Sequence, residues 1–563
     1  MGKSEWGRVN GEGRGVWKWK WEGRFGKRQQ GCAQSKALAT RFVLRYDRVR
    51  LSSGCVGNVL AWMKFPVKGR AFPIVNTPAM KPYTPLRSLF FLLAAMGSVV
   101  MSPAQFRPDF RIKTDDVTVL MGVDAELADG LQRVSHSAHG KFQVSSWTRA
   151  DQFARWKVSA PAAGSYEVFA LVKRAAAQPL VMQLEATGTS LRGEWPANAL
   201  SWQRVKLDGE LALPAGESTL TLRLASSEQK QDFQAELHAI ELVKPQVRVD
   251  AEKRARAMRA NPTWFQQARY GMMVHWTKQS VPLQGEAKPY EQAVADFDVE
   301  AFAEQMKSTG AGFVVFTTSH AMHYFPGPLK SLDAILPGRT AKRDLPADLA
   351  KALGKRGMKL FLYYHLGAHD DAEYLQASGF WETDTTKFFG HWQSMISEIG
   401  ERYGDQLAGW WFDDGSTNYY YRSAPWESLA KAAKAGFAQR MVSFNAWELN
   451  NPTSFHDYCT GEACYDPRGI DGLLKPEDRG IYPSGTHAGL TASACLIADR
   501  NWVHTAPNTP PSALRWNAEQ LTQLLRGFIE HRNVPIFNLE ITQDGKLSPE
   551  SIATLAEAAK KLK

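Results

Sequence analysis

Apolar and polar residues alternate in short runs between about residues 106 and 246. The alternation is clearest at residues 154–158, 165–172 and 220–224, and segments rich in Pro, Ala and Gly precede two of these runs. Strict alternation over four to eight residues is typical of a strand with one buried face. A series of such strands separated by turns predicts an all-β jelly-roll or sandwich domain, which we place at residues 105–246.

The pattern changes from about residue 263, where continuous apolar runs alternate with amphipathic segments. The expected strands cover residues 270–276, 312–317, 358–364, 407–412 and 441–444. Strands that are apolar on both faces and alternate with helices predict a parallel sheet covered by helices. This many units predict an α/β fold of the (β/α)8 type, a TIM-like barrel over residues 263–563. An open doubly wound sheet is the alternative, but no Gly-rich phosphate loop follows these strands.

The expected barrel helices have recognisable beginnings. Asp298 precedes a segment with apolar residues at helical spacing, and Asp344 precedes another that carries Pro346 in its first turn. Asp is a favoured N-cap, and Pro is tolerated in the first turn. A third helix is expected at residues 386–402, and the charged residues 247–262 are expected to form a helical linker.

The net charge of +11 suggests a nucleic-acid partner until its distribution is considered. Residues 1–79 hold 16 of the 68 Lys and Arg residues and 4 of the 57 Asp and Glu residues, so this segment carries +12 and the remainder carries −1. The basic charge belongs to an N-terminal extension and not to a face of the folded domains, so we expect no nucleic-acid partner.

Residues 80–104 have the three parts of a secretory signal peptide. Lys81 and Arg87 precede an apolar run at residues 89–100, and a small-residue cleavage pattern ends at Ala104. The run is shorter than the roughly 20 residues of a transmembrane helix, so we expect a periplasmic or extracellular protein without a stable membrane anchor.

Met80 is then the expected start of translation. Residues 1–79 would be an over-long reading of the gene or a disordered basic extension. The alternative is a true basic tail followed by a buried apolar helix.

Three cysteines follow the expected cleavage site, namely Cys459, Cys464 and Cys495. Export permits one disulfide and one free thiol, and the sequence does not select the pair. No His or Cys group has the spacing of a zinc site, so we expect no metal and no cofactor.

In a barrel of this type, the catalytic side chains lie at the carboxyl ends of the strands. Polar residues that directly follow apolar runs are therefore the candidates: His275, His320, His365, Asp413, Asp414 and Glu462. A single histidine at a strand end is more often structural. Three of them together with two acidic positions predict a shared sugar-binding site.

Six segments resemble, in the same order, the motifs of the retaining α-L-fucosidases, glycoside hydrolase family 29. They are WFQQARYGMMVHW at 264–276, TGAGFVVFTTSH at 309–320, RDLPADLAKALGKRGMKLFLYYHL at 343–366, RYGDQLAGWWFDDG at 402–415, DYCTGE at 457–462 and NVPIFNLEITQDGKLSPES at 533–551. The resemblance covers residues 263–550. Six ordered motifs are a specific signal, whereas any one alone would be weak.

The resemblance implies an exo-acting glycosidase that removes terminal fucose by double displacement. It implies that Asp413 is the nucleophile and that Glu462 is the acid/base. Asp414 is the alternative nucleophile, because the doubled Asp leaves the register ambiguous by one residue and one step along a strand reverses the side chain. Retention requires the two carboxyl groups to lie about 5–5.5 Å apart.

The same resemblance implies that His275 and His320 hold sugar hydroxyls. Aromatic side chains stack on the apolar faces of sugars, and we expect Trp276, Tyr364 and Trp411 to contact the substrate together with Asp414. The expected partner is a fucosylated or related oligosaccharide or glycoconjugate, and the sequence does not predict an oligomeric state.

Two positions depart from the family pattern. A second His normally follows the position of His320, where this chain has Ala321; His323 is a candidate replacement. An Arg expected between the nucleophile and the acid/base is replaced by Ala446 or Trp447. Each lost partner of a sugar hydroxyl should weaken binding by about 1–3 kcal/mol, so the reaction type is a firmer expectation than the sugar.

The β-domain resembles jelly-roll carbohydrate-binding modules over its whole length, without specific motifs. Trp147 and Trp202 are candidates for sugar stacking, whereas Trp156 lies in the middle of a strand and is expected in the core. A purely structural role for the domain is the alternative.

Two further hypotheses remain for the whole chain. The first is a carbohydrate-binding protein on a catalytically decayed barrel, or a glycosidase for a related sugar. The second is a metal-dependent hydrolase, which would need clustered ligands.

Overall fold

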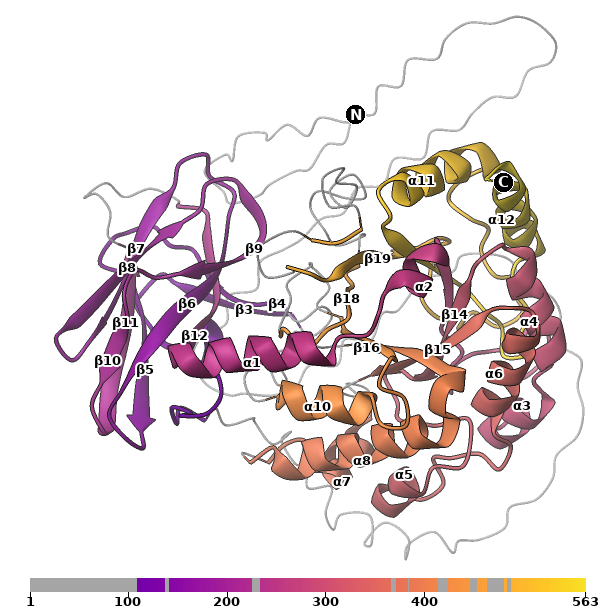
Figure 1. Ribbon diagram of the computed structural model, residues 1–563, viewed down its shortest axis with the longest axis horizontal. Helices are drawn as coiled ribbons and strands as arrows, with labels where there is room; N and C mark the ends of the chain where they lie inside the picture. Colours follow the sequence, from indigo (N-terminus) through magenta and orange to yellow (C-terminus); the bar gives the residue numbers. More distant parts are fainter. Residues whose placement is uncertain are drawn as a thin grey trace, which may run out of the picture. The chain divides into compact units, whose positions relative to one another are not determined.

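The computed structural model describes residues 109–136, 141–224, 233–365, 371–382, 384–413, 424–445, 453–462, 480–482 and 488–562. The expected basic extension at 1–79 and signal peptide at 80–104 lie outside these residues. Antiparallel sheets come first in the chain, and a parallel sheet with its helices follows (Figure 1). Among the described residues, no helix combines the length and the apolar character needed to cross a membrane.

The first part of the described chain is a sandwich of two antiparallel sheets. One is seven-stranded, with the order β10-β6-β12-β4-β3 and with β1 on β12 and β9 on β6; the other is five-stranded, with the order β2-β5-β11-β7-β8. The strands are β1 (Thr118–Met121), β2 (Glu126–Leu127), β3 (Gln132–His136), β4 (Lys141–Ser145), β5 (Phe153–Ala160), β6 (Gly164–Arg174), β7 (Leu180–Ala186), β8 (Thr189–Trp195), β9 (Ala199–Lys206), β10 (Leu211–Leu213), β11 (Gly216–Leu224) and β12 (Ala235–Val243). The expected sandwich fold is confirmed.

Large aromatic side chains fill the space between the two sheets. Alternate residues of β5 are buried, and Trp156 of this strand is 1% exposed. Trp147 is fully buried and meets Trp195 edge to face, with 6.0 Å between ring centroids. Trp147 and Trp156 are therefore core residues, and Trp202 on β9 is half-buried.

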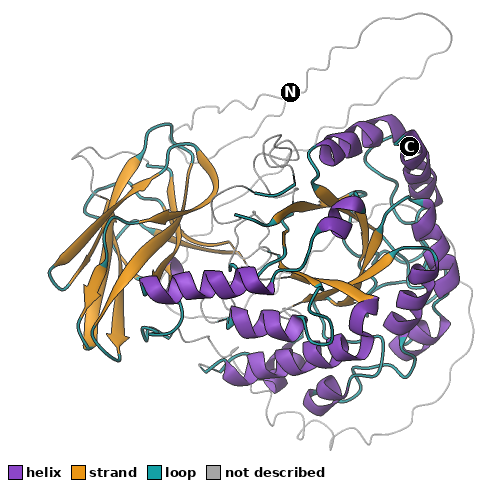
Figure 2. Cartoon of the chain, viewed as in Figure 1, coloured by secondary structure: helices purple, strands orange, loops and turns teal. Residues whose placement is uncertain are grey.

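The second part is a barrel of parallel strands. The eight-stranded sheet has the order β17-β16-β15-β14-β13-β20-β19-β18. The strands are β13 (Gly271–Val274), β14 (Phe313–Ser319), β15 (Lys359–His365), β16 (Leu407–Asp413), β17 (Met441–Phe444), β18 (Tyr458–Cys459), β19 (Thr491–Ile497) and β20 (Val534–Leu539). The strands follow one another around the sheet in chain order, and helices surround them in Figure 2.

A buried carboxylate closes the barrel between β17 and β18. Val442 donates its N–H to Asp457 Oδ2 at 2.8 Å and accepts the N–H of Asp457 at 2.8 Å. Lys434 Nζ also donates to Oδ2 at 2.8 Å, and the N–H of Ala260 donates to Oδ1 at 2.6 Å. The two edges of the sheet are thus joined, and the expected (β/α)8 fold is confirmed.

The described helices include those that the sequence predicts. The bounds are α1 (Pro245–Met258), α2 (Thr263–Gln267), α3 (Tyr290–Asp296), α4 (Val299–Ser308), α5 (Lys330–Ile335), α6 (Leu345–Lys355), α7 (Ala372–Ser378), α8 (Thr386–Tyr403), α10 (Trp426–Ala433), α11 (Ala518–Glu530) and α12 (Pro549–Lys561). Asp298 caps α4 by accepting the N–H of Ala301, and Asp344 caps α6 by accepting the N–H of Ala347, so both expected caps are confirmed.

The two faces of the barrel strands bury separate clusters. Met273, Phe361 and Trp411 belong to the interior cluster, whereas their neighbours in sequence belong to the cluster that faces the helices. The interior is so full that glycine is required in two places. A Cβ atom on Gly271 would lie 2.3 Å from the ring of Phe313, and one on Gly409 would lie 2.3 Å from the ring of Phe361. This packed interior forms a rigid floor for the side chains at the strand ends.

Candidate active site

The alternation of the strands decides which side chains face the barrel axis. Asp413 ends β16 two residues after Trp411, an interior residue, and it is paired in register with His365 at the end of β15. His275 follows β13 two residues after the interior residue Met273. A side chain two residues further along a strand lies on the same face, so these three polar groups extend the interior row at the carboxyl end of the barrel.

His320 reaches the same side because β14 contains a bulge. The register of β14 against β15 shifts between Thr317 and Ser319, where Thr317 pairs with Tyr363 and Ser319 pairs with Tyr364. The extra residue reverses the alternation. The ring of His320 lies 5.1 Å from that of His275 and 5.6 Å from that of His365, measured between centroids.

Asp413 and Glu462 meet at the side-chain amide of Asn445. Asn445 Nδ2 donates to Asp413 Oδ1 at 2.9 Å and to Glu462 Oε1 at 2.7 Å. All three side chains are buried; Asp413 is 8% exposed and Glu462 is 4% exposed. Glu462 lies just beyond β18, where it pairs with Cys495 of β19, so three barrel strands in succession supply the three groups.

The shared donor limits the separation of the two carboxyl groups. Because Oδ1 and Oε1 both bond to one nitrogen, they cannot be farther apart than the sum of the two distances, and the roughly 120° between the two N–H bonds of an amide sets them about 5 Å apart. That spacing matches the roughly 5–5.5 Å of retaining glycosidases and is below the roughly 6.5–9.5 Å of inverting ones.

The second oxygen of Asp413 is also held. The hydroxyl of Tyr363 donates to Asp413 Oδ2 at 2.6 Å, and its ring stacks on Trp411 with 5.1 Å between centroids and 16° between planes. Trp411 is 1% exposed and lies in the interior cluster. Both carboxylate oxygens are therefore fixed by donors from neighbouring strands, which orients the group before a substrate arrives.

A hydrogen bond fixes the orientation of the His275 ring, and burial favours its neutral form. Asn538 donates from Nδ2 to the carbonyl oxygens of Asn501 and Trp502, so its Oδ1 accepts from His275 Nδ1 at 2.7 Å. Burial lowers the pKa of His275 to about 4, against the opposing effect of the Asn538 hydrogen bond. With the proton on Nδ1, the nitrogen Nε2 is an acceptor suited to a sugar hydroxyl. The ring of Trp502 lies 5.2 Å away.

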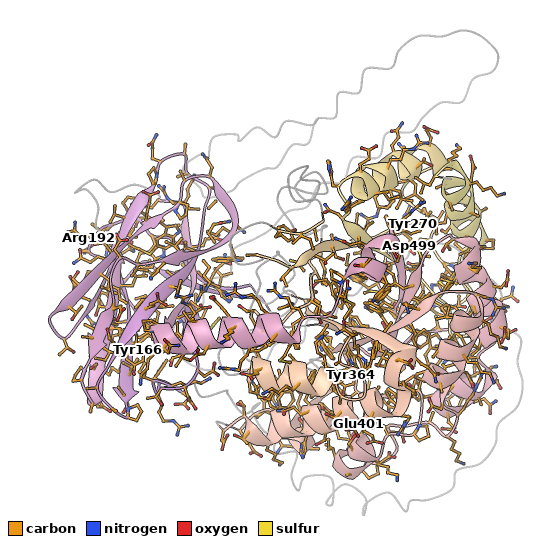
Figure 3. All side chains as sticks on the ribbon, in the orientation of Figure 1. Tyr166, Arg192, Tyr270, Tyr364, Glu401 and Asp499 are labelled. Atoms are coloured by element: carbon orange, nitrogen blue, oxygen red, sulfur yellow. The ribbon has the colours of Figure 1, made fainter. Side chains whose placement is uncertain are left out.

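Three predicted contact residues lie in the packing between strands and helices. Trp276 donates from Nε1 to the carbonyl of Gln543, and the hydroxyl of Tyr364, which Figure 3 labels, donates to Met395 Sδ on α8 at 3.4 Å. The ring of His323 stacks on Tyr374 of α7, with 3.7 Å between centroids and 5° between planes. These positions favour structural roles for Trp276, Tyr364 and His323, and the structure does not bring them to the pair of carboxyl groups.

Other predicted positions lie outside the described residues or differ in conformation. Asp414, Ala446, Trp447 and Cys464 are among the residues that the structure does not describe. Ala321, which stands where the family has a second histidine, is buried with a φ of 56°. This left-handed conformation is costly for a residue other than glycine and marks a constrained turn directly after His320.

Sequence reasoning missed Asn445, Tyr363, Trp502 and Asn538. Asn445 directly follows the apolar strand at residues 441–444, so the rule that selected the other strand-end residues would have selected it. The side of the strand on which Tyr363 lies depends on the register, which the sequence leaves open.

In the described part of the chain, no group of three or more His, Cys, Asp or Glu residues is arranged to hold a metal ion. Cys459 and Cys495 are both buried; Cys459 Sγ donates to the carbonyl oxygen of Thr460 at 3.4 Å, and Cys495 Sγ lies 4.0 Å from Met273 Sδ.

In sequence, the chain is similar to alpha-L-fucosidases. Residues 288–562 match the family model described as alpha-L-fucosidase. The tissue alpha-L-fucosidase of Homo sapiens is 26% identical over 194 residues, which is 29% of this chain and 40% of that protein. The tissue alpha-L-fucosidase of Bos taurus is 30% identical over 137 residues, which is 19% of this chain and 29% of that protein. The chain therefore spans less than half the length of these curated relatives.

Solved structures of fucosidases also align with the chain. The alpha-L-fucosidase AlfC from Lactobacillus casei, in complex with its alpha-L-fucose product, aligns with 18% identity over 54% of this chain and 98% of that chain, at a TM-score of 0.39. A bacterial fucosidase with a monovalent iminocyclitol inhibitor aligns with 17% identity over 54% of this chain and 75% of that chain, at a TM-score of 0.40.

Proposed function

We propose that this chain, whose residues 288–562 belong to the alpha-L-fucosidase family, is an exo-acting retaining α-L-fucosidase that releases terminal fucose from oligosaccharides or glycoconjugates. The observation that carries the proposal is the single amide of Asn445 bonded to both Asp413 and Glu462. It sets two buried carboxyl groups about 5 Å apart at the carboxyl end of a barrel, the spacing that direct attack requires.

In the first step, a carboxylate oxygen of Asp413 attacks the anomeric carbon of fucose. The bond between that carbon and the glycosidic oxygen breaks, and the proton of Glu462 passes to the departing oxygen. The product is a fucosyl ester on Asp413, and Glu462 becomes a carboxylate. Tyr363 and Asn445 keep the attacking group oriented during this step, because each donates to one of its oxygens.

In the second step, Glu462 takes a proton from water while the water oxygen attacks the anomeric carbon. The ester bond to Asp413 breaks, which restores the carboxylate and releases fucose with the configuration of the substrate. Two inversions at one carbon give net retention.

A neutral histidine suits the recognition of an uncharged sugar. His275 is held with its pKa at about 4, so at neutral pH it offers an acceptor nitrogen and brings no positive charge to the site. His320 and His365 complete a group of three rings near Trp502, a combination that can bind hydroxyls and cover an apolar sugar face.

A panel of p-nitrophenyl glycosides tests the proposal. We expect turnover of the α-L-fucoside that is several orders of magnitude lower in Asp413→Ala, with Asp405→Ala, a change at an exposed position before β16, as the matched control. Turnover of another glycoside in place of the fucoside would reassign the sugar. Glycan binding without any turnover would support the decayed-barrel alternative.

We infer from the segment at residues 80–104 that the enzyme is exported to the periplasm or the medium. Its charged start, apolar run and small-residue end support cleavage after Ala104. N-terminal sequencing of the exported protein should give Gln105 as the first residue. Retention of the activity in the cytoplasm would contradict export.

We infer that the sandwich domain binds glycan and holds the enzyme near its substrate. Trp202 supports this role, since it is half-buried on β9 whereas Trp147 and Trp156 are core residues. Affinity electrophoresis of the full chain through fucosylated glycan should show retardation that Trp202→Ala reduces. Equal migration of the two proteins would leave the domain with a structural role only.

A further inference from the structure

Hydrogen bonds hold Asn445 through both its backbone and its side chain. The backbone N–H of Asn445 donates to the carbonyl oxygen of Phe412 at 2.6 Å, and its side-chain Oδ1 accepts the hydroxyl of Thr460 at 3.4 Å. Thr460 in turn accepts the hydroxyl of Ser443 at 3.4 Å. These contacts turn the carbonyl of the amide away from the carboxyl groups and direct both of its N–H bonds toward them.

Asn445 is fully buried, and the two carboxyl groups to which it donates are at most 8% exposed. Two carboxylates about 5 Å apart repel each other, and in a buried site this repulsion is weakly screened. A donor that bonds to both oxygens offsets part of the repulsion without adding a net charge. Asn445 can therefore influence both carboxyl groups at once, which a residue bonded to one of them could not do.

We propose that Asn445 is a positioning residue that couples the charges of Asp413 and Glu462 through one shared amide. This inference rests on the proposed function. In the resting enzyme the amide divides its hydrogen bonding between the two groups. When Asp413 becomes an ester it loses its charge, and Asn445 then bonds more strongly to Glu462, which has become the carboxylate. The amide thereby keeps Glu462 in the ionised form that must accept the proton of water in the second step.

Three variants test the coupling through the pH dependence of kcat/KM on an aryl α-L-fucoside. The acidic limb reports ionisation of the nucleophile and the basic limb reports loss of the proton of the acid. Asn445→Ala removes the shared donor, so both limbs should move to higher pH and kcat should fall about 10- to 100-fold. Asn445→Asp adds a third carboxyl group, so both limbs should move further in the same direction.

Ser493→Ala is the matched control, because Ser493 is a buried polar residue of the barrel strand β19 whose hydroxyl donates to the carbonyl oxygen of Val534 at 2.7 Å. Both limbs should stay in place in this variant. A structural role alone for Asn445 would lower stability in Asn445→Ala and leave both limbs where they are in the unaltered enzyme, and that result would overturn the proposal.

Carboxyl titration by 13C NMR on the full chain separates this inference from the proposed function. The signals of the pair are assigned with Asp413→Asn and Glu462→Gln, and the pair titrates in two coupled steps. Both steps should move to higher pH in Asn445→Ala even when the aryl fucoside is not a substrate. Absence of turnover in the unaltered chain would therefore reject the fucosidase, and unchanged titration would reject the coupling.

Discussion

Two adjacent tyrosines on β15 have opposite surroundings. The hydroxyl of Tyr363 donates to Asp413 Oδ2 at 2.6 Å inside the barrel, whereas the hydroxyl of Tyr364 donates to Met395 Sδ on the helix side. Both side chains are buried, at 0% and 1% exposure. The pair therefore offers a built-in comparison between an orienting tyrosine and a packing tyrosine of the same strand.

Tyr363→Phe should lower kcat by about 10- to 100-fold, because Asp413 loses the donor on one oxygen and is less well oriented for attack. Tyr364→Phe should leave kcat within about threefold, since a sulfur atom is a weak acceptor. Steady-state kinetics on an aryl α-L-fucoside measure both effects. Equal losses in the two variants would contradict the assignment of Tyr363 to the site.

The sequence locates strand ends better than it locates strand faces. His275, His320, Asp413 and Glu462 could be chosen because each follows an apolar run. The sequence predicts a substrate contact at Tyr364, whereas Tyr363 is the residue that bonds to Asp413, because nothing in a continuous apolar strand distinguishes its two faces. The bulge in β14 adds a second source of error, because it reverses the alternation just before His320 and leaves no clear mark in the sequence.

At the scale of elements, one arginine joins the ends of two helices to the start of a strand. Arg440 is fully buried and donates to the carbonyl oxygens of Gly400, Gly404, Leu407, Ala433 and Ala435. Burial lowers its pKa to about 10. Gly400 also accepts the backbone N–H of Gly404, and Ala433 also accepts Nε1 of Trp410, so Arg440 adds donors at the C-termini of α8 and α10, where a cation is favoured.

Arg440→Leu should reduce the free energy of unfolding by at least about 3 kcal/mol, since several buried carbonyl groups lose the hydrogen bonds of Arg440 together. Arg256→Leu is the control, because this arginine is exposed on α1 and its ion pair with Glu252 at 3.4 Å should contribute at most about 1 kcal/mol. Urea denaturation with an unchanged m-value provides the comparison. Similar losses in the two variants would count against the buried network.

Helix caps and the spacing of apolar residues correctly predict the helices and strands in which they occur. α4 and α6 begin where their Asp caps and apolar spacing indicate, and β17 has the predicted bounds. β18 was not predicted as a strand, because it has only two residues and exists through its pairing with β19 and the Asp457 contacts to Val442. Such a short strand forms only when the barrel closes, so the local pattern of residues does not predict it.

At the scale of the molecule, the stability of the barrel should depend on pH through Asp499. This residue follows β19, and burial raises its pKa to about 7, with the charge of Glu540 adding to the effect. Because the folded state holds the proton more tightly than the unfolded state, the stabilisation is complete below about pH 4 and is lost as the pH rises to about 7. Figure 3 labels Asp499 within the barrel part of the chain.

Asp499→Asn keeps the shape of the neutral acid and removes the ionisation. Its free energy of unfolding should match that of the unaltered protein near pH 4 and exceed it by up to about 4 kcal/mol above pH 7. Urea denaturation at pH 4, 5.5, 7 and 8.5 measures the difference. A difference that stays constant over this range would show that Asp499 does not titrate between folded and unfolded states.

The closed barrel brings together the groups of the site. Asp413, Asn445 and Glu462 come from the ends of β16, β17 and β18, and they meet because these strands are neighbours around the barrel. The fold and the two acids could be predicted from the sequence, but the separation between the acids is set by Asn445 and by the register of three strands. The separation of the two carboxyl groups can therefore be obtained only from the folded barrel.

The stereochemistry of the first-formed product tests this distance most directly. Proton NMR at early times of hydrolysis of an aryl α-L-fucoside distinguishes the two anomers of free fucose before they interconvert. With two carboxyl groups about 5 Å apart, α-L-fucose should appear first and β-L-fucose later by mutarotation. Initial release of β-L-fucose would require a water molecule between nucleophile and sugar and would contradict direct attack by Asp413.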